Sequence, residues 1–314
     1  MNMTDIPSFL YEKISAAFDT DQAERIFSGF ETAQQRPITL RANTLRTDAD
    51  YVAKELESAG LSFVRVGWYE DAFVMDPNVR LDELRRLPIY ETGAVYLQSL
   101  SSMLPPLALA PRSNTDILDM CAAPGGKTTE LAAIDPTARI TACEMHAPRA
   151  ERLQYNLKKL GATNVQVMRS DARRLDEFFS FDHILLDAPC TGSGTVRAGD
   201  TTANERITER LLNKVVRSQQ ALLDRALTIL KPGGTLLYST CSILPEENDE
   251  QVLEALSKKR HRTCSLVALD PSAWNAEPYP IPLLLGGQPE TLSIAPTKEF
   301  EGFYMALIKK EYAQ

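Results

Sequence analysis

The chain has 314 residues, of which 44% are hydrophobic, and its 34 basic against 42 acidic residues leave a formal net charge of −8. That length and apolar content predict a globular protein with one large core and a smaller second one. No apolar stretch is long enough to span a bilayer, and the first residues lack a charged region followed by an apolar one. We therefore expect no membrane contact, a cytoplasmic location and, in so acidic a chain, only local basic surfaces for any nucleic acid.

The cysteines and histidines predict no metal site. The five cysteines contain no C-x-x-C pair, and the three histidines are scattered along the chain. Reduced thiols are therefore expected.

The first 112 residues predict a small α+β unit. In chain order its elements are a helical segment over residues 4–30, a strand over 37–45, an amphipathic helix over 49–60 and a hairpin over 63–75. Three prolines and the polar segment 113–115 follow, so the domain boundary is predicted near residue 112.

Residues 113–314 alternate strands with helices, which predicts a single α/β domain built on a parallel sheet. The expected strands lie near residues 115–121, 138–144, 164–170, 182–188 and 234–241. The expected helices lie at about 127–134, 147–161, 203–230 and 246–259. Two further strands, 292–295 and 303–309, are predicted to close the sheet as an antiparallel pair.

A glycine turn follows the first strand of this domain and opens a helix; its residues are Cys121, Ala122, Ala123, Pro124, Gly125, Gly126 and Lys127. Glycine lets the backbone approach a ligand, and the first amides of a helix are free to donate hydrogen bonds. The turn matches neither G-x-G-x-x-G nor the Walker motif, so phosphate binding is not expected, and a plain strand-to-helix turn is the alternative. Carboxylates end the next two strands, Glu144 and Asp171, and suit ribose hydroxyls and an adenine amino group. With no cation cluster for a polyphosphate, S-adenosylmethionine fits this sheet edge better than NAD or ATP.

Two cysteines end strand-like runs, Cys190 after LLDAP and Cys241 after LLYST. The carboxyl ends of parallel strands meet at one edge, so we expect both thiols beside the glycine turn. A thiolate that adds to carbon 6 of cytosine makes carbon 5 nucleophilic enough to accept a methyl group, and an acid such as Asp187 can hold the N3 edge. One thiol suffices for the attack and leaves the other for release, but the residues alone do not rank the two. Cys143 and Cys264 are expected to be structural.

Three segments resemble the motifs of the Sun-type RNA 5-methylcytosine methyltransferases: DMCAAPGGKT, LLDAPCTGSGT and YSTCSILPEENDEQV. The resemblance continues into LRANTL, VYLQSLSSM and EGFY, so it covers nearly the whole chain. It implies a Rossmann-like class I methyltransferase sheet with a small N-terminal α+β RNA-binding domain and S-adenosyl-L-methionine as methyl donor. The implied substrate is structured RNA, with ribosomal RNA ahead of transfer RNA, either free or within a ribosomal particle.

The resemblance also implies site residues. In that family the cysteine corresponding to Cys241 is the nucleophile, the one corresponding to Cys190 helps to release the product, and Asp187 faces both cofactor and cytosine. The implied cofactor contacts are Cys121, Ala122, Ala123, Pro124, Gly125, Gly126, Lys127, Glu144, Arg149, Asp171 and Asp187.

Two other classes of protein remain as alternatives. An amino-group methyltransferase would carry an aromatic residue after Asp-Pro-Pro, where this chain has Asp187-Ala-Pro-Cys190, and a DNA cytosine methyltransferase would attack with its Pro-Cys thiol. A non-catalytic RNA-binding ribosome-assembly factor would retain the fold without turnover, since fold alone does not establish activity. The presence of both thiols, Asp187 and the complete glycine turn disfavours the second alternative.

Overall fold

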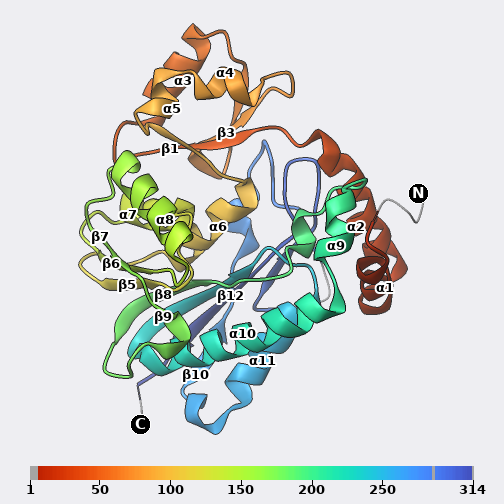
Figure 1. Ribbon diagram of the computed structural model, residues 1–314, viewed down its shortest axis with the longest axis vertical. Coiled ribbons are helices and arrows are strands. Elements are labelled where there is room, and N and C mark those ends of the chain that lie inside the picture. Colours follow the sequence, from red (N-terminus) through yellow and green to blue (C-terminus); the bar gives the residue numbers. More distant parts are fainter. Residues whose placement is uncertain (1–5, 285–286, 313–314) are drawn as a thin grey trace.

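The structure, a computed structural model, describes residues 6–284 and 287–312 (Figure 1). Residues 1–5 lie outside the described part of the chain, and residues 4 and 5 are the first two of the helical segment predicted over 4–30. Among the described residues, no helix has the length and apolar character needed to cross a membrane.

A small antiparallel sheet forms in the first third of the chain, in the strand order β2-β3-β1-β4. Its elements are β1 (Thr39–Ala42), α3 (Ala49–Ser58), β2 (Phe63–Val66), β3 (Tyr69–Met75), α4 (Leu81–Arg85), α5 (Pro88–Glu91) and β4 (Val95–Leu97). Leu40, Leu56 and Phe73 are fully buried between the helices and this sheet. The predicted strand, helix and hairpin are thus confirmed. Strand β4 was not predicted because three residues are too short to show an alternation.

The first predicted helical segment is two helices, α1 (Ser8–Ala17) and α2 (Thr20–Thr32). The chain turns at Asp19, whose side chain accepts a hydrogen bond of 2.9 Å from the backbone of Gln22 and so caps α2. The buried side chains of both helices pack against residues of the second half of the chain, in a cluster that includes Val196, Ile207 and Leu244. These two helices therefore do not share the core of the small sheet. A short 3-10 turn, η1 (Ala33–Gln35), links them to β1.

The large sheet has eight strands: seven follow the order β10-β12-β9-β8-β5-β6-β7, and β11 lies off this path and pairs with β12. The parallel strands are β5 (Asp116–Asp119), β6 (Arg139–Cys143), β7 (Val165–Met168), β8 (Phe181–Asp187) and β9 (Leu230–Thr240). Strand β12 (Phe303–Lys310) pairs antiparallel with β9, β10 (Cys264–Val267) and β11 (Leu292–Ile294). All five predicted parallel strands and the predicted antiparallel pair are confirmed. Strand β10 was not predicted.

Helices cover both faces of the large sheet. Figure 1 shows α7 (Gly126–Ile134) and α8 (Ala147–Leu160) above it and α10 (Glu209–Ile229) and α11 (Asp249–Ser257) below it. The helix predicted over 203–230 is broken into α9 (Thr201–Arg206) and α10, because Thr208 leaves the helical conformation and its hydroxyl caps α10 at Leu211. The helix predicted from residue 246 begins at Asp249, after the 3-10 turn η4 (Pro245–Glu247). The other 3-10 turns are η2 (Ala172–Arg174), η3 (Ser193–Thr195), η5 (Lys259–His261) and η6 (Pro271–Trp274).

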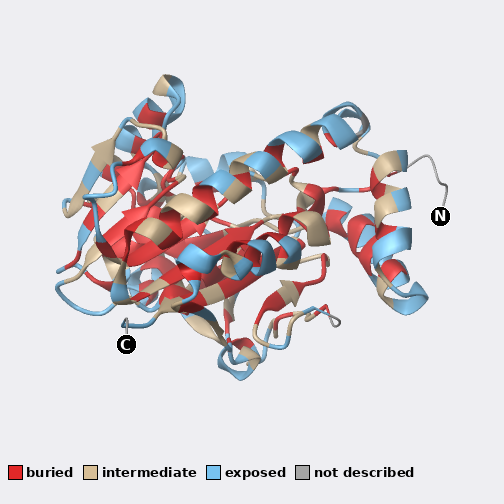
Figure 2. Cartoon of the chain, turned by 90° about the horizontal axis from the view of Figure 1, so that it is seen from below, coloured by how far each residue is buried: buried red, intermediate tan, exposed pale blue. Residues whose placement is uncertain are grey.

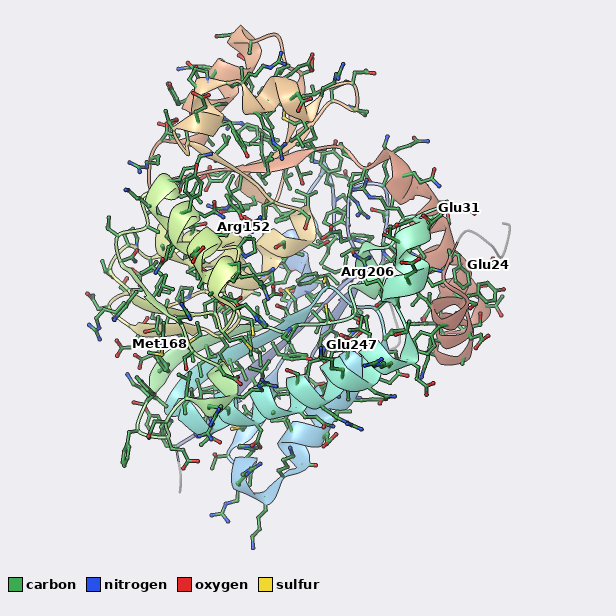
Figure 3. All side chains as sticks on the ribbon, in the orientation of Figure 1. Glu24, Glu31, Arg152, Met168, Arg206 and Glu247 are labelled. Carbon is green, nitrogen blue, oxygen red and sulfur yellow. The ribbon has the colours of Figure 1, made fainter. Side chains whose placement is uncertain are left out.

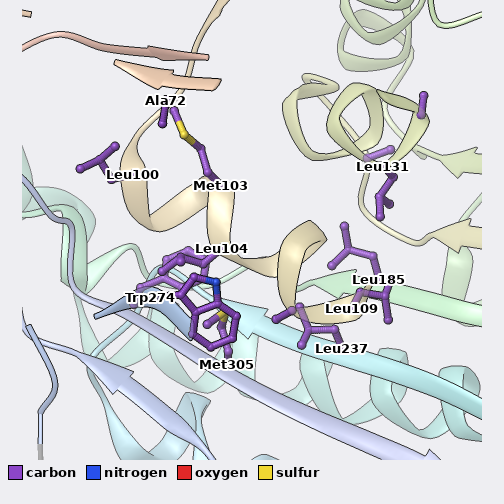
Figure 4. Close-up of a cluster of buried hydrophobic side chains, with 14 of the residues drawn as sticks. Ala72, Leu100, Met103, Leu104, Leu109, Leu131, Leu185, Leu237, Trp274 and Met305 are labelled. Carbon is purple, nitrogen blue, oxygen red and sulfur yellow. The ribbon is translucent and has the colours of Figure 1, made fainter. Parts of the chain in front are cut away.

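Alternate residues of the central strands face opposite cores. Leu185 and Leu237 belong to the cluster under α6 (Leu100–Leu109), whereas Leu186 and Leu236 belong to the cluster under α10. Figure 2 shows the central strands buried and the outer faces of the helices exposed. In Figure 4, Ala72 of β3 lies beside Met103 of α6, which shows that the small sheet packs on the core of the large one.

The direction of strand order reverses beside β5. From β5 the chain moves outward through β6 and β7, and then returns to place β8 and β9 on the other side of β5. Ligands of open parallel sheets bind at the carboxyl ends of the strands at such a reversal. The expected site therefore lies at the ends of β5, β8 and β9.

Candidate active site

A pocket of about 270 Å³ lies at the carboxyl ends of β5, β8 and β9. Of the predicted site residues, those that line it are Cys121, Ala122, Ala123, Pro124, Gly126, Lys127, Asp187 and Cys241. Those outside its lining are Gly125, Glu144, Arg149, Asp171 and Cys190. The glycine turn, one acid and one thiol thus share one cavity.

The glycine turn is held tightly from two sides. Gly125 has a φ of 108°, a left-handed conformation that favours glycine, and it caps the start of α7. A Cβ added to Gly126 would lie only 2.8 Å from the ring of Tyr96 in strand β4 of the small sheet. From the other side, Arg149 and Asn156 of α8 donate hydrogen bonds of 3.0 and 2.8 Å to the carbonyl oxygens of Ala123 and Pro124.

The two acids after β6 and β7 already have protein partners. Glu144 is 4% exposed, and its carboxylate accepts from the backbone of His146 at 2.9 Å and lies 3.4 Å from Nε of Arg149. Asp171 accepts hydrogen bonds from Nε and Nη2 of Arg173, at 2.9 and 2.8 Å, and these hydrogen bonds lower its pKa. Arg149 therefore ties Glu144 to the glycine turn, and Asp171 lies in a bidentate ion pair.

The two thiols meet at the end of the sheet. The Sγ atoms of Cys190 and Cys241 are 3.1 Å apart, which confirms the predicted convergence of the two strand ends. Cys241 lines the pocket and Cys190 lies behind it. The hydrogen bond with Cys241 and burial raise the pKa of Cys190 well above its usual value. Cys190 is therefore held as a neutral thiol.

Asp187 and Lys127 form an ion pair at the floor of the pocket. Lys127 Nζ donates to Asp187 Oδ2 at 2.7 Å and to Ser102 Oγ at 2.8 Å, and Ser239 donates to the other oxygen of Asp187 at 2.8 Å. Burial lowers the pKa of Lys127, but the charge and hydrogen bond of Asp187 outweigh it, so the net shift is upward. Lys127 therefore keeps its positive charge beside the thiols.

Sequence reasoning missed one buried acid in the pocket, Asp119. Its Oδ2 accepts from Thr128 Oγ1 at 2.7 Å, whereas its Oδ1 has no partner among the described residues. Burial raises the pKa of Asp119 to about 7. The signal available in the sequence was an acid at the carboxyl end of the strand DILD.

Other lining residues come from segments distant in the chain, namely Tyr96, Leu97, Gln98, Ser99, Ser102, Thr195, Glu301 and Phe303. The first five precede or begin α6, and the last two precede or begin β12. Several of these residues belong to the segments that carry the family resemblance, but nothing in their composition indicates a pocket. Among the residues that the structure describes, no cluster of three or more His, Cys, Asp and Glu side chains could hold a metal ion.

Two glycines set the position of Cys241. The amide of Gly194 donates to the carbonyl of Cys241 at 3.0 Å, and the amide of Gly302 donates to the carbonyl of Gly194 at 2.9 Å. A Cβ on Gly194 would lie 2.0 Å from the carbonyl oxygen of Gly302. Position 194, whose backbone is bonded to that of Cys241, therefore has no room for a side chain.

Gly194→Ala is expected to lower the stability and to displace Cys241. Since the added methyl collides with backbone, the loop must move, and overpacking of this kind costs about 1–3 kcal/mol. Urea unfolding measures the stability, and the rate at which a thiol reagent modifies Cys241 measures its displacement. An unchanged midpoint together with an unchanged rate would show that the loop is not tight.

Comparisons with known families and with curated proteins both match this chain to rRNA methyltransferases. Residues 106–309 match the family described as 16S rRNA methyltransferase RsmB/F, and residues 6–82 match its ferredoxin-like domain. The chain is 37% identical to ribosomal RNA small subunit methyltransferase B of Sodalis glossinidius, over 80% of this chain and 57% of the relative. It is 36% identical to the 25S rRNA (cytosine-C(5))-methyltransferase nop2 of Schizosaccharomyces pombe, over 80% of this chain and 42% of the relative. The chain thus spans about half the length of these curated relatives.

Solved structures share the fold. A methyltransferase homologue from Pyrococcus horikoshii is 32% identical, with a TM-score of 0.73 over 97% of this chain and 99% of the other. NSun6 from the same organism, solved with SFG, has a TM-score of 0.81 over 99% of this chain and 100% of the other, at 22% identity.

Proposed function

Because this chain belongs to the 16S rRNA methyltransferase RsmB/F family, we propose that it is an S-adenosylmethionine-dependent RNA (cytosine-5)-methyltransferase that acts on ribosomal RNA. The observation that carries the proposal is the pair of thiols 3.1 Å apart, with Cys241 in the same pocket as Asp187, Lys127 and the glycine turn. The relatives described above are rRNA methyltransferases, which favours ribosomal over transfer RNA. The cytoplasmic location stays a prediction.

The pocket suits S-adenosylmethionine. Asp119 has an unpaired buried oxygen that can accept a hydrogen bond from the cofactor, and Gly126 leaves the backbone accessible at the start of α7. Bound there, the cofactor supplies an electrophilic methyl group. NSun6, which shares this fold, was solved with SFG, an S-adenosylmethionine analogue. Contacts of the cofactor with Gly125, Glu144, Arg149 and Asp171 stay predictions, since these residues lie outside the lining of the pocket.

We assign the attack to Cys241. It lines the pocket, whereas Cys190 lies behind it as a neutral thiol that can donate a hydrogen bond to the Cys241 sulfur. The Cys241 thiolate adds to carbon 6 of cytosine, N3 takes up a proton, and the electron pair reaches carbon 5. Carbon 5 then bonds to the methyl group, whose bond to the sulfonium sulfur breaks and leaves a neutral thioether. The carbon 5 proton passes to a base or to water, the N3 proton is given up, and the carbon 6–sulfur bond breaks, which regenerates the thiolate and the aromatic ring. Cys190, in contact with the departing sulfur, is placed to assist this release.

Asp187 and Lys127 hold the N3 edge of the base in this scheme. The Lys127 ammonium is charged and donates to Asp187, so the pair offers both a donor and an acceptor beside the thiols. Such a pair can hold the N3 edge while its proton is gained and lost. The cytosine must leave its stack with the neighbouring bases to enter the pocket.

A labelling experiment tests the proposal. The purified protein is incubated with tritiated-methyl S-adenosylmethionine and total RNA from a strain deleted for its gene; the RNA is then separated by size and digested to nucleosides. Label in 5-methylcytidine from ribosomal RNA is expected, and label in transfer RNA alone would correct the substrate. No label in any RNA or ribosomal particle, with cofactor binding intact, would favour a non-catalytic assembly factor.

A further inference from the structure

One buried carboxylate, Glu247 in the turn η4, contacts the loops of both cysteines and has no part in the scheme above. It is 0% exposed and accepts four hydrogen bonds. The donors are the Thr191 amide at 2.8 Å, the Thr191 hydroxyl at 2.6 Å, Gln219 Nε2 at 3.1 Å and the Ser242 hydroxyl. Figure 3 shows Glu247 in the interior, beside α10. Thr191 follows Cys190 and Ser242 follows Cys241, so a single side chain joins the two loops.

On the Cys190 side, the chain is held at both neighbours of the cysteine. Gln219 of α10 donates one hydrogen to Glu247 and the other to the carbonyl of Pro189, at 3.0 Å. Thr191 is bound to Glu247 through its amide and its hydroxyl. The residue between Pro189 and Thr191 therefore has little freedom to move.

On the Cys241 side, the order of the hydroxyl donors follows from Glu247. Ser242 has one hydrogen and gives it to the carboxylate, so Ser193 must donate to Ser242 across their 2.8 Å contact. Ser193 belongs to the loop after Cys190, which makes this a second link between the loops. The adjacent Asn248 accepts from Thr240 at 2.6 Å and donates to the carbonyl of Ser242 at 3.0 Å, so it clamps both neighbours of Cys241.

The contacts of Glu247 suit an ionised carboxylate, because each of the four partners can donate to it. Burial raises the pKa of Glu247, and the four donors oppose that shift. The negative charge of Glu247 is also among the causes that keep the pKa of Cys190 high.

We propose that Glu247 is the positioning residue of the thiol pair: its buried carboxylate locks the two cysteine loops together and so keeps the Cys190 and Cys241 sulfurs in contact. The proposal rests on the proposed methyltransferase function for its catalytic consequence, but the contact of the sulfurs is a property of the fold. Glu247 does not line the pocket, so its effect on methyl transfer passes through the two loops.

The test is Glu247→Ala, which removes both acceptor oxygens. The Thr191 amide and Gln219 share one oxygen, and the Thr191 and Ser242 hydroxyls share the other, so the variant removes the side chain that joins the two loops. The kcat for methyl transfer is expected to fall by about 10²-fold, because an error of about 1 Å in the placement of reacting groups costs that much. The KM for S-adenosylmethionine should stay within about twofold, since the cofactor pocket is untouched.

A second readout reports the sulfur contact without catalysis. Excess oxidised glutathione converts two neighbouring thiols into a disulfide with release of two reduced glutathione molecules, and mass spectrometry measures the peptide that joins Cys190 to Cys241. Its formation is expected to be about tenfold slower in Glu247→Ala, on the scale of loss that misplacement causes. Asp135→Ala is the matched control: Asp135 is also buried, but it follows the carboxyl end of α7, at the opposite edge of the sheet. It should leave the disulfide rate unchanged.

The outcomes separate the two proposals. An unchanged kcat and disulfide rate in Glu247→Ala would overturn the positioning role, and so would an equal slowing in Asp135→Ala. If Glu247→Ala does not fold, Ser242→Ala removes the hydrogen bond on the Cys241 side together with the contact to Ser193, and it should lower both rates. Unchanged rates there would also overturn the positioning role. If the unmodified protein methylates no RNA, the proposed function fails while the disulfide rate still decides the role of Glu247.

Discussion

Cys241→Ala is expected to abolish methyl transfer to RNA while leaving the protein folded and able to bind S-adenosylmethionine. Without the sulfur, no covalent bond to carbon 6 forms, and carbon 5 stays too poor a nucleophile to take the methyl group. Loss of a nucleophile in other enzymes lowers kcat by factors on the order of 10⁴ or more. Cys241 is half-buried and ends β9 beside the pocket, so removal of its sulfur leaves the core of the sheet intact. Transfer of labelled methyl groups measures the first effect, and equilibrium dialysis measures cofactor binding.

Cys190→Ala is the matched variant, because it removes the neighbouring sulfur from outside the pocket. The attack by Cys241 should still occur, but release should slow, so that a covalent protein–RNA complex accumulates and migrates as a larger band in a denaturing gel. Addition of Cys241→Ala to this variant should remove the band. If Cys241→Ala keeps full activity and Cys190→Ala loses it, the assignment of the two thiols is reversed.

Asp187→Asn is expected to reduce both stability and methyl transfer. The substitution leaves the Lys127 ammonium, whose side chain is 12% exposed, without its counter-charge. Removal of one partner of a largely buried ion pair costs about 2–3 kcal/mol in such a partly exposed site. The rate should fall by about 10²–10³-fold, because the carboxylate that holds the N3 edge is lost.

Urea unfolding and the methyl-transfer rate measure the two effects of Asp187→Asn separately. The control is Asp50→Asn, which breaks an ion pair with Arg65 in which the Asp50 side chain is 78% exposed. Exposed pairs contribute at most about 1 kcal/mol, so this variant should keep its stability and activity. Equal unfolding midpoints for the two variants would mean that the pair at the pocket floor is no more important than a surface pair.

The sequence allowed most of the secondary structure to be predicted where the hydrophobic period was long and unambiguous. The five parallel strands are short apolar runs bounded by turns, and α3 and α8 show a clear helical period. Two of the errors fell where local capping overrides that period. Thr208 breaks the segment predicted as one helix, and Asp19 divides the first segment in the same way.

The sequence by itself determined the α/β class of the large domain, the glycine turn, and the meeting of Cys190 and Cys241 at one sheet edge. These follow from local patterns, since parallel strands necessarily bring their carboxyl ends together. Only the tertiary structure decided which thiol lines the pocket and where α1 and α2 pack. It also showed that Asp119 and Glu247 are both buried acids but differ in their hydrogen-bond partners. Asp119 has an oxygen without a partner among the described residues, whereas Glu247 is bound by four donors from three segments. Such contacts join residues up to 56 positions apart, and no local period or spacing encodes them.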